Sequence, residues 1–248
     1  MKIKKWSVFG ILILSVFLDV SSSYGGAPDD DYNFSWLDPD KKIYVLQNRR
    51  FKKTGSPEIY LMGGASLEDT YRNVYQVQPR LGFWFSEEFG IETFYAAKFN
   101  SINNAYRALD EAINQNASDV TKTPYIREVT SDIGILFNWA PWYAKINVFN
   151  SILYFDWYFS AGIGSLTTRV GPGDYNDALY KSYWQSENLF AVFLGTGQIF
   201  HLSDHWKIRL DVLGHFYSAP IYGGAPGAPT NSAIFSNFDV NVGIGFKL

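Results

Sequence analysis

The chain contains no cysteine, only two methionines and three histidines, and no long apolar run after its first twenty residues. Without cysteine it cannot form a disulfide framework, a thiolate metal site, a thiol nucleophile or the lipidated anchor of a lipoprotein. An excess of positive charge is also missing, because 21 basic and 24 acidic residues give a net charge of −3. A basic surface for nucleic acid is therefore not expected.

The first segment carries the features of an export signal. Three lysines among the first five residues precede an apolar run over 6–18, which is too short for a membrane-spanning helix. Small residues follow, and cleavage after Gly25 or Ala27 would suit a signal peptidase. We therefore expect residues 1–25 to be a cleaved signal peptide, whose removal lowers the basic count to 18 and the acidic count to 23 and leaves a charge of −5.

The rest of the chain is rich in aromatic residues, which make up 18% of it, yet the mean hydropathy is −0.11. Polar residues are threaded between the apolar ones, as in strands with one apolar and one polar face. Residues 26–55 are charged and turn-rich, and we expect a periplasmic N-terminal segment there. Residues 56–248 contain eight runs with period-two character, at 57–66, 71–86, 89–100, 125–139, 152–168, 187–202, 206–217 and 235–248.

The alternation favours strands in a membrane. In the last run, apolar residues from Phe238 to Leu248 share one face, while Asn237, Asp239 and Asn241 share the other. Strands can cross a bilayer only as a closed sheet, because an open edge would leave backbone groups unpaired in hydrocarbon. The sequence therefore predicts an all-β fold, a closed antiparallel transmembrane β-barrel of about eight strands in the outer membrane of a Gram-negative cell. A water-soluble β-sandwich also alternates and is the competing interpretation.

Link lengths support this topology. If both termini are periplasmic, the outer links 101–123, 169–186 and 218–232 are long and most inner links are short, as in bacterial barrels. The link after the fourth run, 140–151, could hold a small hairpin. Aromatic residues gather near both ends of the runs, as at the two membrane interfaces. Pro79 lies within a run and cannot donate a ladder hydrogen bond, so a bulge is expected there.

Parity places charged side chains inside the barrel. The candidates are Arg80, Glu92, Lys98, Glu128, Asp132, Asp156, Lys207, Arg209, Asp211, Asp239 and Lys247. An eight-stranded barrel has an interior only just wide enough for side chains, so we expect these groups to pair and plug it. A narrow ion path is the alternative interpretation.

The C-terminus resembles the β-signal recognised by the outer-membrane barrel assembly machinery. The pattern of a polar residue, a glycine and two hydrophobic residues is matched by Asn241, Gly243, Phe246 and Leu248. The resemblance implies that this machinery is a partner. Leu248 departs from the pattern, since phenylalanine is most usual at that position.

Four stretches, 45–51, 57–64, 138–151 and 155–164, are similar to the outer-membrane β-barrel domain proteins common in Bdellovibrio and myxobacteria. Ala144 departs from that pattern, which has glycine there. The resemblance spans about residues 40–248 and implies a barrel related in architecture to the OmpA and OmpW classes. It brings no established activity and no functional residues.

We therefore expect a non-enzymatic outer-membrane protein with a structural or surface-interaction role, whose outer loops form the contact surface. Outer-membrane lipid and lipopolysaccharide are its expected surroundings. Neither a cofactor nor a metal is indicated, and the sequence shows neither a ligand nor an oligomeric state. One alternative is a narrow pore or OmpW-like conduit for small solutes. The other is a lipid A-modifying enzyme using His201 with Ser203, or His215 with Ser218, but the first pair falls at a periplasmic turn and the second has opposite parity.

Overall fold

The computed structural model describes residues 49–67, 71–115, 125–148, 151–172, 184–222 and 229–248. The expected signal peptide and residues 26–48 lie outside these ranges, as do parts of the expected outer loops. The described strands are β1 (Ser56–Ser66), β2 (Arg72–Trp84), β3 (Phe89–Ile102), β4 (Tyr125–Val148), β5 (Ser151–Pro172), β6 (Gln185–His201), β7 (Trp206–Tyr222) and β8 (Pro229–Lys247). A single described helix, α2 (Asn104–Gln115), lies between β3 and β4.

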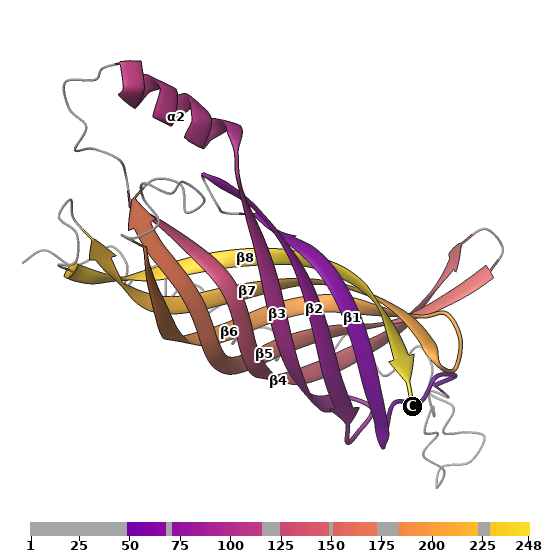
Figure 1. Ribbon diagram of the computed structural model, residues 1–248. Helices are drawn as coiled ribbons and strands as arrows, with labels where there is room; N and C mark the ends of the chain where they lie inside the picture. The colour runs from indigo at the N-terminus through magenta and orange to yellow at the C-terminus, as the bar shows by residue number, and fades with distance from the viewer. Residues whose placement is uncertain (1–48, 68–70, 116–124, 149–150, 173–183, 223–228) are drawn as a thin grey trace, which may run out of the picture. The chain divides into compact units, whose positions relative to one another are not determined.

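The eight strands form a closed barrel in which each strand pairs antiparallel with the next, as Figure 1 shows. The ring closes where β1 pairs with β8, for example Ile59 with Phe246. Backbone groups along the strands are therefore paired on both sides, and no strand edge is left free. The predicted closed antiparallel barrel is confirmed.

Burial alternates along the strands, with one face inside the barrel and the other outside. On β1 the side chains of Glu58 and Tyr60 are buried, whereas Ile59 and Leu61 are 42% and 54% exposed. Strand β6 has apolar residues on both faces, and the structure turns Phe193 inward and Leu194 outward. The outer surface is therefore lined by exposed apolar side chains, and the charges lie inside.

The two ends of the barrel differ. The links after β2, β4 and β6 are short and lie at the end where the chain terminates, while α2 lies at the opposite end (Figure 1). At the short-link end β4 and β5 continue as a hairpin, pairing from Trp142 with Trp157 to Val148 with Ser151. This hairpin occupies the link in which a small hairpin was expected. No helix among the described residues is long and apolar enough to span a membrane.

The expected bulge at Pro79 is wrong. The register to β3 is the same before and after it, with Val77 opposite Ala97 and Arg80 opposite Phe94, and Leu61 of β1 still faces Pro79. The β2–β3 ladder omits the pairs at Gln78 and Pro79, so the missing N–H is accommodated without an extra residue. The pairing of β4 with β5 does shift register, once between Val129 and Ser131 and once between Trp139 and Trp142.

At the end opposite the short links, here called the outer end, several strands are longer than the sequence predicts. β5 continues to Pro172, β7 to Tyr222, and β8 begins at Pro229, so the predicted outer loops are partly strand. The expected loop 101–123 also contains α2. Asn103 caps this helix, because its side-chain oxygen accepts a hydrogen bond of 3.0 Å from the backbone N–H of Tyr106.

Candidate functional site in the barrel interior

The interior of the barrel is a stack of side-chain layers. Along β7, from the short-link end outward, Lys207, Arg209, Asp211, Leu213 and His215 all point inward and are buried. Because each strand is paired residue by residue with its neighbours, each of these residues belongs to a layer shared by several strands.

A central layer joins opposite walls. Arg80 Nη1 on β2 lies 3.1 Å from Glu92 Oε1 on β3 and 2.8 Å from Asp211 Oδ2 on β7. Arg209 on β7 also pairs with Glu92. Tyr158 Oη on β5 donates to Asp211 Oδ2 at 2.9 Å and accepts from Arg209 Nε at 2.7 Å. Two guanidinium groups thus face two carboxylates, and their charges are compensated within the layer.

Amide side chains on β2 extend this layer to β8, the last strand of the ring. Gln78 accepts hydrogen bonds from Arg80, and Asn241 on β8 donates to Asp211 Oδ1 at 2.9 Å. Gln76 donates in turn to Asn241. The layer therefore ties β2, β3, β5, β7 and β8 together through side chains alone, which adds cross-links that the backbone ladders do not supply.

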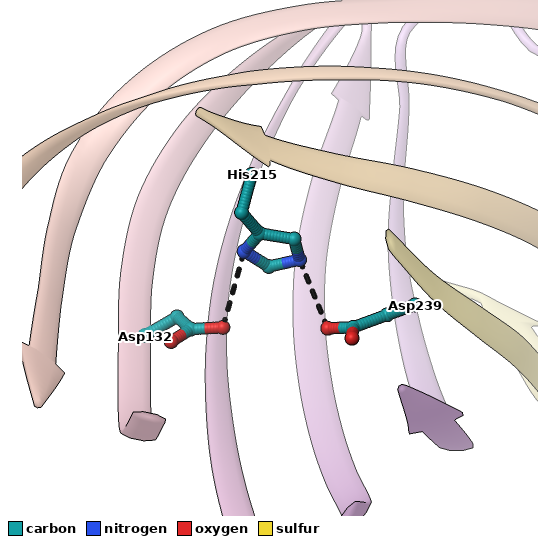
Figure 2. Close-up of side chains that lie close together, drawn as sticks. All are labelled: Asp132, His215 and Asp239. Carbon is teal, nitrogen blue, oxygen red and sulfur yellow. Dashed lines mark ion pairs between the residues drawn. The ribbon is translucent and has the colours of Figure 1, made fainter. Parts of the chain in front are cut away.

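An outer layer contains two carboxylates, an ammonium and an imidazole. Lys98 Nζ lies 3.1 Å from Asp132 Oδ2 and 2.7 Å from Asp239 Oδ2. His215 stands between the same carboxylates, as Figure 2 shows, with Nδ1 3.3 Å from Asp132 Oδ2 and Nε2 2.9 Å from Asp239 Oδ2. These four side chains are each no more than 1% exposed.

An inner layer holds Asp156 between basic groups. Lys53 Nζ lies 2.9 Å from Asp156 Oδ1, and His201 Nε2 lies 2.7 Å from Asp156 Oδ2. Phe51 stacks on the His201 ring at a centroid distance of 5.1 Å. Residues just before β1 therefore pack against the inner end of the barrel and are continuous with its interior.

The N-terminal contact also involves Glu87, in the turn between β2 and β3. Its carboxylate accepts hydrogen bonds from the Thr54 hydroxyl at 2.7 Å and from the Lys53 and Thr54 backbone N–H groups at 3.2 Å. Partial burial opposes ionisation of Glu87, but these hydrogen bonds and the nearby Arg49 charge outweigh it and hold the pKa of Glu87 below its ordinary value. Gly55, at φ 72°, makes the turn into β1 that brings Thr54 to Glu87.

The interior is not polar throughout, which corrects the expectation of a polar lumen. An apolar cluster that includes Phe94, Leu136, Phe193 and Leu213 fills part of the interior between the central and outer charged layers. The rings of Phe94 and Phe193 meet edge to face at 5.1 Å. On β7 this cluster is represented by Leu213, between Asp211 and His215.

The residues expected in the lumen occupy these layers. Buried side chains are found at Arg80, Glu92, Lys98, Glu128, Asp132, Asp156, Lys207, Arg209, Asp211 and Asp239. Glu128 belongs to a separate pair with Arg72 Nη2, at 2.6 Å, near the outer end. Lys247 is not buried and instead donates to the Lys52 carbonyl at 2.7 Å.

Sequence reasoning missed several interior groups. Glu58, which pairs with Lys207, was not among the candidates, and neither were Arg72, His201 and His215. Each of them lies an even number of positions from another interior residue on its strand, so the alternation of the sequence already predicts that its side chain points inward. Lys53 carried no such signal, because it precedes the first strand.

The histidine–serine pairs do not assemble. His201 is buried against Asp156, whereas Ser203 is exposed and its hydroxyl accepts the backbone N–H of Trp206 at 3.0 Å. His215 points inward and Ser218 outward. Neither serine is placed beside its histidine as a nucleophile requires.

The residues of the C-terminal motif have different surroundings. Asn241 is buried in the central layer, and Phe246 packs against the Trp206 ring at 5.1 Å. Leu248 is 64% exposed. Gly243 faces inward on β8, opposite Met62 of β1.

No protein-family model and no curated protein matches the chain. Among solved structures, it is similar to the N-terminal β-barrel domain of Pseudomonas aeruginosa OprF, with 11% identity, a TM-score of 0.45 and coverage of 79% of this chain and 98% of that one. It is also similar to OprG of Pseudomonas aeruginosa, with 11% identity, a TM-score of 0.40 and coverage of 80% of this chain and 98% of that one. A third similar structure is Ail of Yersinia pestis, with 9% identity, a TM-score of 0.38 and coverage of 79% of this chain and 99% of that one. The barrel is established by the strand pairing of the chain itself, and the resemblance to the Bdellovibrio and myxobacterial family stays an expectation.

Proposed function

We propose that the chain is an outer-membrane β-barrel with a structural or surface-interaction role, and that side chains close its lumen. The observation that carries the proposal is the central layer, where Arg209 of β7 pairs with Glu92 of β3. These strands are four places apart in a ring of eight, so their side chains meet across the full width of the barrel. Arg80 and Arg209 are also the two largest fully buried side chains.

The outward face supports a membrane setting. Apolar side chains at the middle of the strands are exposed, among them Ile135 at 54% and Ile163 at 58%. Trp139, Trp142 and Trp206 are exposed near the short-link end, where an interfacial aromatic belt is expected. An apolar surface that encircles a barrel is costly in water and is favourable in lipid. Lipid and lipopolysaccharide are the proposed surroundings, and the barrel assembly machinery is the proposed insertion partner.

The outer end supports a contact role. Helix α2 projects from it (Figure 1) and is held by Tyr106, which is buried and lies edge to face with Tyr71 at 6.5 Å. Arg107 and Glu111, on the same helix, are exposed. Polar side chains on a held helix offer a surface to a partner outside the cell. We propose no enzymatic role.

A conduit for small solutes is the second candidate. A cavity of about 350 Å³ near the outer end is lined by Arg72, Lys98, Glu128 and Arg169, among others. Such a polar cavity could admit a solute from outside. The charged layers below it oppose the passage of a solute, because the buried side chains of Arg80, Glu92 and Arg209 occupy the lumen there.

Four measurements test the proposal. The purified chain should show heat-modifiable gel mobility, which is typical of a detergent-stable barrel. In planar bilayers it should give no stable single channels. Stable wild-type channels would favour the conduit, and recovery of the chain in the soluble periplasm would overturn the membrane assignment. Lipid A mass spectra that change with His201→Ala would overturn the non-enzymatic assignment.

A further inference from the structure

The outer layer brings together a set of potential metal ligands. Asp132 of β4, His215 of β7 and Asp239 of β8 are all buried, and one ligand atom from each lies within 4.8 Å of the other two. Figure 2 shows the three side chains converging from their strands. Two carboxylates and one imidazole form a donor set suited to divalent first-row metals such as Zn²⁺, Co²⁺ and Mn²⁺.

The hydrogen bonding of these groups is incomplete. Among the described residues, Oδ1 of Asp132 and Oδ1 of Asp239 have no hydrogen-bond partner, and the ring nitrogens of His215 lie 3.3 Å from Asp132 Oδ2 and 2.9 Å from Asp239 Oδ2 without hydrogen-bond geometry. A buried polar atom without a partner is costly, and a neutral imidazole has only one N–H to offer two carboxylates. A cation placed among the three side chains would take lone pairs from each of them.

Lys98 provides the competing charge. Its ammonium lies 3.1 Å from Asp132 Oδ2 and 2.7 Å from Asp239 Oδ2, so the carboxylates already attract a cation to this position. Lys98 also lines the outer cavity of about 350 Å³. That cavity gives the lysine side chain room to withdraw, and through Lys98 it adjoins the two carboxylates.

We propose that Asp132, His215 and Asp239 form a binding site for one divalent transition-metal ion, which enters from the outer end and replaces the Lys98 ammonium between the carboxylates. His215 makes the site selective, since an imidazole nitrogen favours transition metals over Mg²⁺ and Ca²⁺. A bound ion would join β4, β7 and β8 across the interior and stabilise the outer part of the barrel. This site is independent of whether the lumen conducts.

Co²⁺ is a suitable probe, because its visible bands report coordination by protein ligands. The full chain, folded in detergent, should bind one equivalent. His215→Gln should weaken binding by at least about tenfold and remove the visible bands. Lys98→Gln should strengthen binding by about tenfold, because the competing charge is gone. The matched controls are His201→Gln, a buried histidine outside the cluster, and His205→Gln at an exposed turn, and both should bind as the wild type does.

Heat-modifiable mobility checks that each variant is folded. If His215→Gln does not fold, the wild-type melting temperature decides, since it should rise with Co²⁺ but not with Mg²⁺. The proposal is overturned if neither the wild type nor Lys98→Gln binds Co²⁺ stoichiometrically. It is also overturned if His215→Gln binds Co²⁺ as tightly as the wild type, or if binding is lost in His205→Gln, which would indicate adventitious surface binding.

Discussion

Gly243 and Met62 lie directly opposite each other where β8 closes the ring on β1. A Cβ atom at position 243 would stand 2.7 Å from the Met62 Cα and closer still to the Leu61 carbonyl oxygen. Backbone atoms cannot move aside as the end of a flexible side chain can. The glycine of the C-terminal motif therefore has a structural reason to be there, separate from any recognition by the assembly machinery.

Gly243→Ala should destabilise the barrel even when no assembly machinery is present. The added methyl group forces β1 and β8 apart at the closing seam, at a cost of about 1–3 kcal/mol. Urea unfolding of protein refolded into detergent micelles measures this cost. Gly63→Ala is the matched control, because a Cβ there would have its nearest contact at 3.9 Å. Equal urea midpoints for the two variants would contradict the structural role.

Leu248→Ala should leave the stability of the refolded barrel unchanged but reduce its assembly in cells. The side chain is 64% exposed, and the Leu248 backbone N–H bond to the Pro57 carbonyl at 3.0 Å does not depend on it. The urea midpoint of the refolded protein should therefore stay unchanged. If the terminal residue is read by the assembly machinery, the amount of folded barrel in the outer membrane of expressing cells should fall severalfold. An unchanged amount would remove Leu248 from the proposed signal.

Glu92→Gln should be strongly destabilising. Glu92 pairs with both Arg80 and Arg209, so its neutralisation leaves two buried guanidinium groups with less compensating charge. Removing one partner of a buried ion pair costs about 3–5 kcal/mol. The free energy of unfolding from urea titration is the measurement, with Glu111→Gln on the exposed surface of α2 as the control. Adding Arg209→Gln to Glu92→Gln should recover part of the loss, and a purely additive loss would speak against the network.

The alternation of the sequence predicted which way most strand residues point. Asp156 is inside and Trp157 outside, as expected from their parity. Parity gives a face but no depth, so it could not show that Asp132, His215 and Asp239 share one level. That convergence depends on the stagger between strands, which is a property of the closed ring.

Three other features could not be predicted correctly from the sequence: the facing of β6, helix α2 and the course of β2 at Pro79. On β6 both faces are apolar, and only closure of the barrel decides that Phe193 joins the interior cluster. The sequence predicts a loop over 101–123, because this stretch is rich in Asn, Asp and Ser, but the structure has helix α2 there, capped by Asn103. The bulge expected at Pro79 does not occur, since β2 loses ladder pairs there without gaining a residue.

The contact between Glu87 and residues 53–54 should depend on pH. The folded pKa of Glu87 is lower than its ordinary value of 4.5, so its ionised form stabilises the contact. That stabilisation is fully present above pH 4.5 and is lost as the pH falls through the lower, folded pKa. The amide proton shift of Thr54, followed by NMR, should titrate with a midpoint below 4.5. Glu87→Gln should abolish this titration and Glu88→Gln should keep it, whereas a titration that survives in Glu87→Gln would assign it to another group.

A charge on the outer face tests whether lipid surrounds the barrel. Ile163 and Leu202 are almost equally exposed, at 58% and 56%, but Ile163 lies near the middle of β5 and Leu202 in the turn after β6. In water, arginine at either position would change stability little. In a bilayer, arginine costs about 2–4 kcal/mol near the midplane and about 0–1 kcal/mol near the interface. Unfolding from phospholipid vesicles should therefore show a much larger loss for Ile163→Arg than for Leu202→Arg, and equal losses would mean that the middle of the barrel does not face hydrocarbon.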